Sequence, residues 1–293
     1  MVLRRFFWAL SLPFTLLMAP PATFGQGTNV LLSKSRLPSV ERKQALGVWL
    51  TNSPSPLYYD KTTLLKAMDE LQQAGFTALY PNVWSRGTTF HRSQFAPVEP
   101  PLLKAGLNLD PICAISQEGR KRGMKVIPWF EYGLMEPADA AVVKQHPEWV
   151  LTRRDGNPVM TMHGKEMVWL NPAHPGVRER FIGLVVEVMK RCKMDGLQLD
   201  DHFAWPVELG YDPYTTALYQ QDTGVQPPKD HTNRYWMTWR RRQLTGLLRE
   251  LRQLLQGVDR PAPAAQPQAA PQPPAPAAAP LRLQWQAHAV VSG

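Results

Sequence analysis

Short apolar runs alternate with amphipathic stretches of helix length along the middle of the chain, from Leu46 to Asp201. The alternation occurs four times, and it is typical of parallel strands joined by crossover helices. It predicts strands over Leu46–Leu50, Phe76–Val83, Met124–Phe130 and Gly196–Asp200. It predicts helices over Asp60–Ala74, Asp110–Arg122, Pro175–Arg191 and Arg234–Gln256.

Signals at the ends of these segments support the assignment. Asp60 is suited to cap the start of the first helix and Gly75 to end it. A longer insertion, rich in Pro and Gly, separates the third strand from the third helix and contains an extended piece at Met167–Asn171. A loop containing Tyr211–Tyr214 precedes the last helix.

This order of elements predicts an α/β fold of the (β/α)8 TIM-barrel type in which only the first four βα units are present. A complete barrel takes about 250 residues, whereas the predicted units already occupy residues 46–257. An open half would leave unpaired strand edges and an apolar inner face. We therefore expect a truncated product or a chain that needs a partner, and we predict no particular oligomeric state.

The residues after the predicted barrel segment change in character. Residues 258–280 form a Pro/Ala/Gln-rich linker, a composition that cannot bury a core and remains disordered and extended. Residues 281–293 alternate Leu and Trp with Arg and Gln at strand period, which predicts a short strand-like tail. That tail is either a fifth strand of the sheet or a terminal segment that does not join the sheet.

The N-terminus has the three parts of a secretion signal. Arg4 and Arg5 precede an apolar run from Phe6 to Ala19, and small residues follow. Residues 1–25 are therefore predicted to be a signal peptide, and residues 26–45 a lead-in. The apolar run is shorter than the roughly 20 residues that span a bilayer. We expect an exported protein of the periplasm, cell envelope or extracellular space, without stable membrane insertion after signal cleavage.

Charge and composition exclude several classes of protein. The hydrophobic content of 44% excludes a chain that is disordered throughout. The net charge is +9, but part of the excess belongs to the signal and part to one helix, where a solvated face explains it. Because no basic motif with interleaved aromatic residues is present, we expect no nucleic-acid partner.

Cys113 and Cys192 are the only cysteines, and each falls inside a predicted helix. An exported protein could join them. Their placement inside two separate helices nevertheless favours two free, buried thiols over a disulfide bond.

Candidate catalytic residues lie at the carboxyl ends of the strands, where barrel enzymes place their chemistry. Period-two alternation turns Gln198 and Asp200 toward the barrel axis, and Asp201 opens the following loop. The same alternation places Glu131 at the mouth after the third strand. Because cleavage of a glycosidic bond requires a pair of carboxylates, we predict Asp200, Asp201 and Glu131 as catalytic. The alternative is that these carboxylates only cap or hold loops.

A second set of residues fits sugar binding, because aromatic rings stack on pyranose faces while Asn and His bind hydroxyl groups. Tyr80 and two members of the set, Asn82 and Trp84, are predicted to share one face of the second strand. The predicted substrate-binding residues are Trp49, Asn82, Trp84, Trp129, Asn171 and His202. The alternative is that several of these aromatic residues fill the core.

The Asp200, Asp201 and His202 run is also a candidate metal site. No second histidine stands at ligand spacing, so we expect no metal and no cofactor. A serine nucleophile is not supported, because the chain has no G-x-S-x-G motif.

Five ordered segments together resemble the glycosyl-hydrolase-like family ten proteins of bacteria, which are common among cyanobacteria. The segments are residues 46–52, 80–84, 126–131, 169–172 and 195–203. The resemblance implies a (β/α)8 barrel, secretion to the envelope and glycoside hydrolysis, with bacterial wall glycan as a substrate. It also implies that the Asp200 and Asp201 pair is catalytic. The chain departs from the family where a fifth strand would begin, because the Pro/Ala/Gln tract stands there.

The leading hypothesis is an exported glycoside hydrolase-like protein that cleaves O-glycosidic bonds of a polysaccharide or peptidoglycan-like glycan. Two alternatives stay open. The chain is an inactive or glycan-binding remnant that lacks half of the barrel, or it is an envelope scaffold protein.

Overall fold

The structure is a computed structural model of the whole chain. It describes residues 45–52, 55–104, 110–257 and 289–291. Its contacts divide the chain into two units, and every described residue lies in the second unit, Lys43–Gly293. Within the described ranges, no helix combines the length and the apolar character needed to cross a bilayer.

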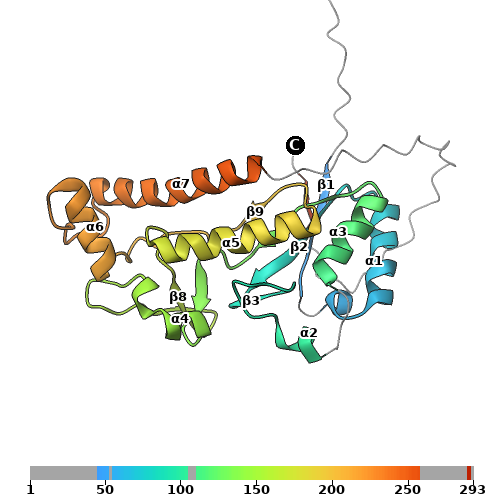
Figure 1. Cartoon of the computed structure of the whole chain (residues 1–293), viewed down its shortest axis with the longest axis horizontal. Coiled ribbons are helices and arrows are strands. Elements are labelled where there is room, and N and C mark those ends of the chain that lie inside the picture. The colour runs from blue at the N-terminus through green and yellow to red at the C-terminus, as the bar shows by residue number, and fades with distance from the viewer. Residues whose placement is uncertain (1–44, 53–54, 105–109, 258–288, 292–293) are drawn as a thin grey trace, which may run out of the picture. The chain divides into compact units, whose positions relative to one another are not determined.

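A mostly parallel sheet forms the centre of the fold (Figure 1). Strand β1 pairs in parallel with β2, β2 with β5, and β5 with β9. These strands are β1 (Leu46–Leu50), β2 (Ala78–Ser85), β5 (Trp129–Phe130) and β9 (Gln198–Leu199). The predicted α/β class is confirmed.

The third predicted strand is divided into two short pieces. Strand β4 (Lys125–Val126) and β5 both pair in parallel with β2. Between them stands Pro128, which has no backbone N–H to donate to a neighbouring strand. Its carbonyl still accepts a hydrogen bond from the backbone N–H of Gln198 (3.0 Å), so the chain stays extended through the interruption.

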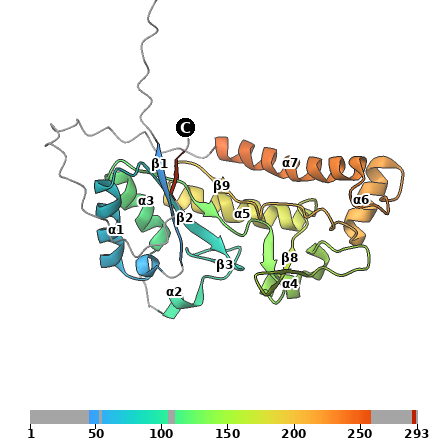
Figure 2. The ribbon, with the colours of Figure 1, turned by 180° about the vertical axis from the view of Figure 1, so that it is seen from behind.

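The four predicted helices are present, and each follows its strand in the expected order. They are α1 (Lys61–Gln73), α3 (Pro111–Lys121), α5 (Pro175–Cys192) and α7 (Arg234–Gln256). As predicted, Asp60 caps α1, and its side chain accepts a hydrogen bond from the backbone of Thr63. Helix α1 contacts α3, α3 contacts α5, and α5 contacts α7. Figure 2 shows α5 and α7 running side by side.

Apolar side chains fill the space between the sheet and these helices. Val48, Leu79 and Phe130 are at most 2% exposed. Gly119 allows α3 to approach the sheet closely, because a Cβ atom there would lie 2.9 Å from both Leu79 Cδ1 and Val126 Cγ2. The helix side of the sheet therefore forms the main part of the core.

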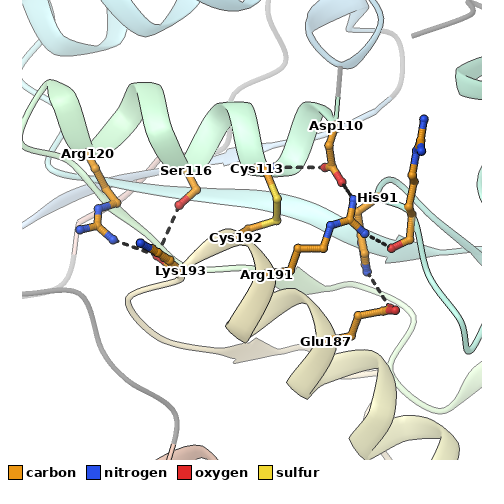
Figure 3. Close-up of a disulfide and its surroundings, with 10 residues drawn as sticks. His91, Asp110, Cys113, Ser116, Arg120, Glu187, Arg191, Cys192 and Lys193 are labelled. Atoms are coloured by element: carbon orange, nitrogen blue, oxygen red, sulfur yellow. Dashed lines mark hydrogen bonds and ion pairs between the residues drawn. A yellow bond between two sulfur atoms is a disulfide. The ribbon is translucent and has the colours of Figure 1, made fainter. Parts of the chain in front are cut away.

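A disulfide joins α3 and α5 (Figure 3). Cys113 and Cys192 are bonded with their Cα atoms 4.5 Å apart, so the prediction of two free thiols is wrong. The two helices pack side by side, which brings together residues 79 positions apart in the sequence. Beside the bond, Asp110 caps α3 through the backbone N–H of Cys113 and pairs with Arg191.

The insertion between β5 and α5 forms a small antiparallel sheet, which includes the extended piece predicted from the sequence. Its strands are β6 (Met135–Pro137), β7 (Met160–Met162) and β8 (Lys165–Trp169). The insertion also contains α4 (Ala141–Gln145) and the 3-10 helix η2 (Pro147–Trp149). Further short elements are η1 (Pro56–Tyr58), β3 (Thr88–Thr89) and α2 (Pro100–Lys104).

Helix α6 (Pro213–Thr223) occupies the segment predicted as a loop before α7. It packs against α7 through an aromatic cluster of Tyr219, Trp236 and Trp239. Beside this cluster, the buried Arg240 guanidinium donates hydrogen bonds to backbone carbonyls rather than to a carboxylate. The acceptors are the carbonyls of Pro206, Val207, Leu209 and His231. Burial lowers the pKa of Arg240 to about 10, so the side chain remains charged at neutral pH.

The end of the chain returns to the sheet. Strand β10 (Ala289–Val291) pairs antiparallel with β1. The described part of the tail is therefore a strand, but it is not a parallel fifth strand beside β9. The predicted signal peptide at residues 1–25 and the linker at residues 258–280 lie outside the described residues.

Candidate active site

The sheet register places one row of polar and aromatic side chains on the face away from the helices. Trp49 is opposite Tyr80, Asn82 is opposite Trp129, and Trp129 is opposite Gln198. Residues opposite each other on neighbouring strands point to the same side. We call these five residues the inner-face row.

The inner-face row is connected across the sheet. The indole N–H of Trp49 on β1 donates a hydrogen bond to Gln198 Oε1 on β9 (2.8 Å). The rings of Trp49 and Tyr80 pack with their centroids 5.7 Å apart. The first and last parallel strands of the described sheet are thus linked through side chains on this face.

Glu131 follows β5 directly, at the carboxyl end of the strand. Its Oε2 accepts a hydrogen bond from Asn82 Nδ2 (2.7 Å). Its backbone carbonyl lies 2.9 Å from His202 Nδ1, and the ring of Tyr132 packs 5.6 Å from the His202 ring. Two predicted sugar-binding residues therefore hold Glu131 in position: Asn82 through the Glu131 carboxylate and His202 through the Glu131 backbone carbonyl.

Asp200 follows β9 and is held from two sides. Its Oδ2 accepts a hydrogen bond from the indole N–H of Trp129 (2.7 Å), and its Oδ1 accepts one from the backbone N–H of Asp201 (2.8 Å). The side chain of Asp201 is 82% exposed and lies 3.4 Å from His202 Nδ1. The Asp200 carboxylate is oriented by its neighbours, whereas Asp201 points into solvent.

The arrangement brings two carboxylates, from neighbouring parallel strands, to the same end of the sheet. Glu131 is bonded to a side chain of β2, and Asp200 to a side chain of β5. Both carboxylates are partly exposed. Such a pair can serve as a proton donor and as an ionised nucleophile or base.

Trp84 does not join the inner-face row, which corrects the predicted side for this residue. Strand β2 has a register irregularity, because Asn82 pairs with Trp129 but Trp84 pairs with Phe130. An extra residue in one strand reverses the side to which the following residues point. Trp84 is 1% exposed and lies under Arg180 of α5, 5.0 Å from guanidinium carbon to ring centre.

Asn171 is also placed apart from the strand ends. It is fully buried, and its Nδ2 donates hydrogen bonds to Asp212 (3.3 Å) and Thr215 (2.8 Å) at the start of α6. Its Oδ1 accepts a hydrogen bond from the backbone N–H of Ala173 (2.9 Å). Asn171 therefore fastens α6 to the segment that follows β8.

Three residues of the site are absent from the predicted set: Tyr80, Gln198 and Tyr132. The alternation along the second strand already places Tyr80 on the face of Asn82. The alternation that turns Asp200 inward also predicts the inward direction of the Gln198 side chain. Its partner Trp49 is 149 residues away, so no local pattern reveals their contact. Tyr132 packs on His202, and its position directly after Glu131 was the available signal.

One group of metal-ligand side chains occurs in the part of the chain that the structure describes, and it includes none of the site residues. It consists of Asp110, Cys113 and Cys192. The two sulfur atoms are bonded to each other and so are not available as thiolate ligands.

Comparison with known proteins yields a family and several relatives. Residues 44–265 match the model of a family described as Glycosyl hydrolase-like 10. The glycosyl hydrolase DigH of Escherichia coli K12 is 27% identical over 208 residues, which are 63% of this chain and 44% of DigH. The glycosyl hydrolase YngK of Bacillus subtilis is 20% identical over 221 residues, 72% of this chain and 40% of YngK. The chain thus spans less than half the length of these curated relatives.

Solved structures are similar at a lower level. An alpha-galactosidase from Thermus thermophilus, TtGalA, matches with a TM-score of 0.44 and 19% identity, over 71% of this chain and 36% of TtGalA. A hypothetical protein from Ruminiclostridium thermocellum matches with a TM-score of 0.47 and 15% identity, over 72% of this chain and 94% of that protein.

Proposed function

Because the chain belongs to the glycosyl hydrolase-like 10 family, we propose that it hydrolyses O-glycosidic bonds of a polysaccharide by means of a carboxylate pair. The observation that carries this proposal is the hydrogen-bonded placement of Glu131 and Asp200 at the ends of neighbouring parallel strands. The two curated relatives are also described as glycosyl hydrolases.

Asp200 is the proposed nucleophile or base, and Glu131 the proposed acid. Cleavage of a glycosidic bond needs a proton for the leaving oxygen and a carboxylate that attacks the anomeric carbon or activates water. Two donors fix the Asp200 carboxylate, which favours it over the solvent-exposed Asp201. Asp201 is then assigned to the rim of the site beside His202.

Sugar rings are proposed to bind over the inner-face row. Trp49, Tyr80 and Gln198 are only partly buried, so their aromatic surfaces and amide are accessible to a ligand. Aromatic rings stack on the apolar faces of sugars, while side-chain amides bind hydroxyl groups. Trp129 contributes by orienting Asp200, because its indole N–H is bonded to that carboxylate and is not free to bind a sugar hydroxyl.

The substrate is proposed to be a glycan of the bacterial wall, met after export to the periplasm, envelope or cell exterior. The Cys113–Cys192 disulfide supports this location, because disulfides persist mainly in oxidising compartments. The fold is proposed to be part of a (β/α)8 barrel. The order of parallel strands and their neighbouring helices supports this assignment.

The experiment is to incubate the full chain with purified bacterial wall glycan and to measure the release of reducing ends. We expect Asp200→Asn to lower the rate by about 100-fold or more, because acid and base groups contribute roughly that much. Asp155→Asn is the matched control. Among the described residues, Asp155 accepts a hydrogen bond only from the nearby Asn157 backbone in an exposed loop, and asparagine can accept the same bond.

An equal rate for Asp200→Asn and Asp155→Asn would exclude the proposed role of Asp200. If the unaltered chain releases no reducing ends, this chain is not a hydrolase of that glycan. Binding of the same glycan without turnover would then identify the glycan-binding alternative.

A further inference from the structure

A pocket of about 320 Å³ lies between α5, the α4 and η2 segment, and the loop of residues 94–97. It shares no residue with the inner-face row or with Glu131, Asp200 and His202. Its volume is at the lower end of the range for ligand sites, about 300–1,000 Å³. The pocket is therefore large enough for one ring-sized unit of a ligand.

Phe95 presents an aromatic ring at this pocket that is exposed yet fixed in place. It is 37% exposed. Its backbone N–H donates a hydrogen bond to Ser93 Oγ (3.0 Å), and its carbonyl accepts one from Arg180 Nε (3.2 Å). The backbone N–H of Gln94 donates to Glu187 Oε1 (3.0 Å). Polar bonds to α5 thus hold an apolar ring at the surface, which is a preorganised platform for a ligand.

Two glycines of α5 make room for the aromatic walls of the pocket. A Cβ atom on Gly183 would lie 2.3 Å from Phe95 Cε1, and one on Gly176 would lie 2.5 Å from Trp149 Cζ2. These glycines are seven positions apart, and residues two turns apart lie on one side of a helix. Glycine within a helix costs about 0.5–1 kcal/mol relative to alanine. Helix stability alone therefore does not explain Gly183.

The polar lining of the pocket is balanced in charge. Arg180 lines it and pairs with Glu136 (3.0 Å), which is 1% exposed. Among the described residues, no partner donates a hydrogen bond to Glu136 Oε2. That atom lies 3.0 Å from the position of a Cβ on Gly87, another lining residue. An unused acceptor therefore lies behind the pocket wall. Lining residue Glu179 also opposes the charge of Arg180, so the site fits a neutral ligand better than an ion.

We propose that this pocket is a second glycan-binding site, which holds one neutral sugar ring against Phe95. The amides of Gln94 and Gln145, both in the lining, are suited to bind hydroxyl groups. Trp149 also lines the pocket, but one of its faces is already covered by the His146 ring, with centroids 3.9 Å apart. Phe95 is then the ring on which the sugar stacks. The choice of a glycan rests on the proposed function, but binding here requires no hydrolysis.

The test is calorimetric titration of the full chain with the tetrasaccharide of β-1,4-linked N-acetylglucosamine, which reports affinity and number of sites. Four variants are compared with the unaltered chain: Phe95→Ala, Gly183→Ala, Leu103→Ala and Asp200→Asn. Leu103 is the matched control, because it is a 67% exposed apolar residue outside the pocket. We expect Phe95→Ala and Gly183→Ala to lower the affinity for the tetrasaccharide at one class of binding sites at least tenfold. Leu103→Ala and Asp200→Asn are expected to leave the affinity of that class unchanged.

Gly183→Ala separates binding from folding. The added methyl group displaces the Phe95 ring, while alanine favours the helix, so we expect weaker binding without a lower midpoint of thermal unfolding. The proposal is overturned if Phe95→Ala titrates like Leu103→Ala, or if the unaltered chain does not bind the tetrasaccharide. Retained binding at this pocket by a chain that releases no reducing ends would overturn the proposed hydrolysis alone.

Discussion

The two faces of the central sheet differ in what their side chains contact. On the helix side, Val48, Leu79 and Phe130 are buried against α1, α3 and α5, and a disulfide joins two of these helices. On the inner face, Trp49 and Gln198 are partly exposed and are joined to each other by a hydrogen bond.

This difference separates two tasks within one sheet. Burial of apolar surface is worth roughly 25 cal/mol per Å², so the helix side supplies most of the stability. The inner face holds polar groups whose hydrogen bonds contribute only about 1 kcal/mol each but fix the orientation of the two carboxylates. Changes on the helix side are therefore expected to affect mainly unfolding, and changes on the inner face mainly turnover.

The largest effect is expected from removal of the disulfide. Replacing both cysteines, by Cys113→Ser and Cys192→Ser, frees a loop of 79 residues in the unfolded chain. For a loop of this length the expected loss is about 4 kcal/mol in the free energy of unfolding. Urea unfolding with and without a reducing agent measures it: the midpoint of the unaltered chain shifts under reduction, and that of the double variant does not.

The rate of glycan hydrolysis under native conditions is expected to stay unchanged in the double variant, because the bond lies on the helix side. A large loss of turnover in a chain that is still folded would show that the two faces are not independent.

The second effect concerns the buried charge pair between Glu136 on β6 and Arg180 on α5. Burial raises the pKa of Glu136 from 4.5 to about 7, although Arg180 opposes the shift. The folded state therefore holds this proton more tightly than the unfolded state does. The stabilisation is fully present below pH 4.5 and is lost as the pH rises through 7. The shift corresponds to up to about 3 kcal/mol.

Glu136→Gln should remove this pH-dependent loss of stability, because glutamine does not ionise. The measurement is the free energy of unfolding of the variant and of the unaltered chain from pH 4 to pH 8. Glu118→Gln is a control of opposite sign, because Lys121 and Arg122 lower the pKa of Glu118. That carboxylate stabilises the fold above its unfolded pKa, and the stabilisation is lost in acid. Parallel curves for Glu136→Gln and the unaltered chain would contradict the assignment.

The sequence predicted the parts of the fold that depend on local pattern. Apolar periodicity located β1 and the four long helices, because each buries one side along its own length. Apolar periodicity does not predict helix α6, and the segment around Asp212 and Pro213 resembles a loop in sequence. The capping signal is nevertheless present, because Asp caps helices and Pro is suited to the first helical position. The disulfide was missed, because it depends on which helices are neighbours.

In the candidate site, too, the sequence predicted what depends on local alternation and did not predict contacts between distant residues. Alternation placed Asn82, Trp129 and Gln198 on one face, as the register shows. It failed at Trp84, where one irregularity in β2 reverses the side. The contacts of Asn171 could not be predicted, because its partners Asp212 and Thr215 are more than 40 residues away. Local pattern therefore identifies the face of a regular strand, but not a bulge or a distant partner.

The smallest effect on stability is expected on the inner face. Trp129→Phe keeps an aromatic ring but removes the N–H that donates to Asp200 Oδ2. The loss of one hydrogen bond costs about 1 kcal/mol in the free energy of unfolding. Of the two donors that bond the Asp200 carboxylate among the described residues, the backbone N–H of Asp201 then remains. We therefore expect kcat for glycan hydrolysis to fall at least tenfold while KM stays nearly unchanged.

Trp169→Phe is the matched control for this substitution. Trp169 on β8 is 4% exposed, and its indole N–H has no partner among the described residues. Its replacement removes no hydrogen bond and no contact with Asp200, so kcat is expected to stay unchanged. If Trp129→Phe lowers only stability and leaves kcat like that of Trp169→Phe, the inner face is a second core. The hydrogen bond from Trp129 would then not contribute to the catalytic role of Asp200. The proposed division between a stabilising helix side and a catalytic inner face would be contradicted.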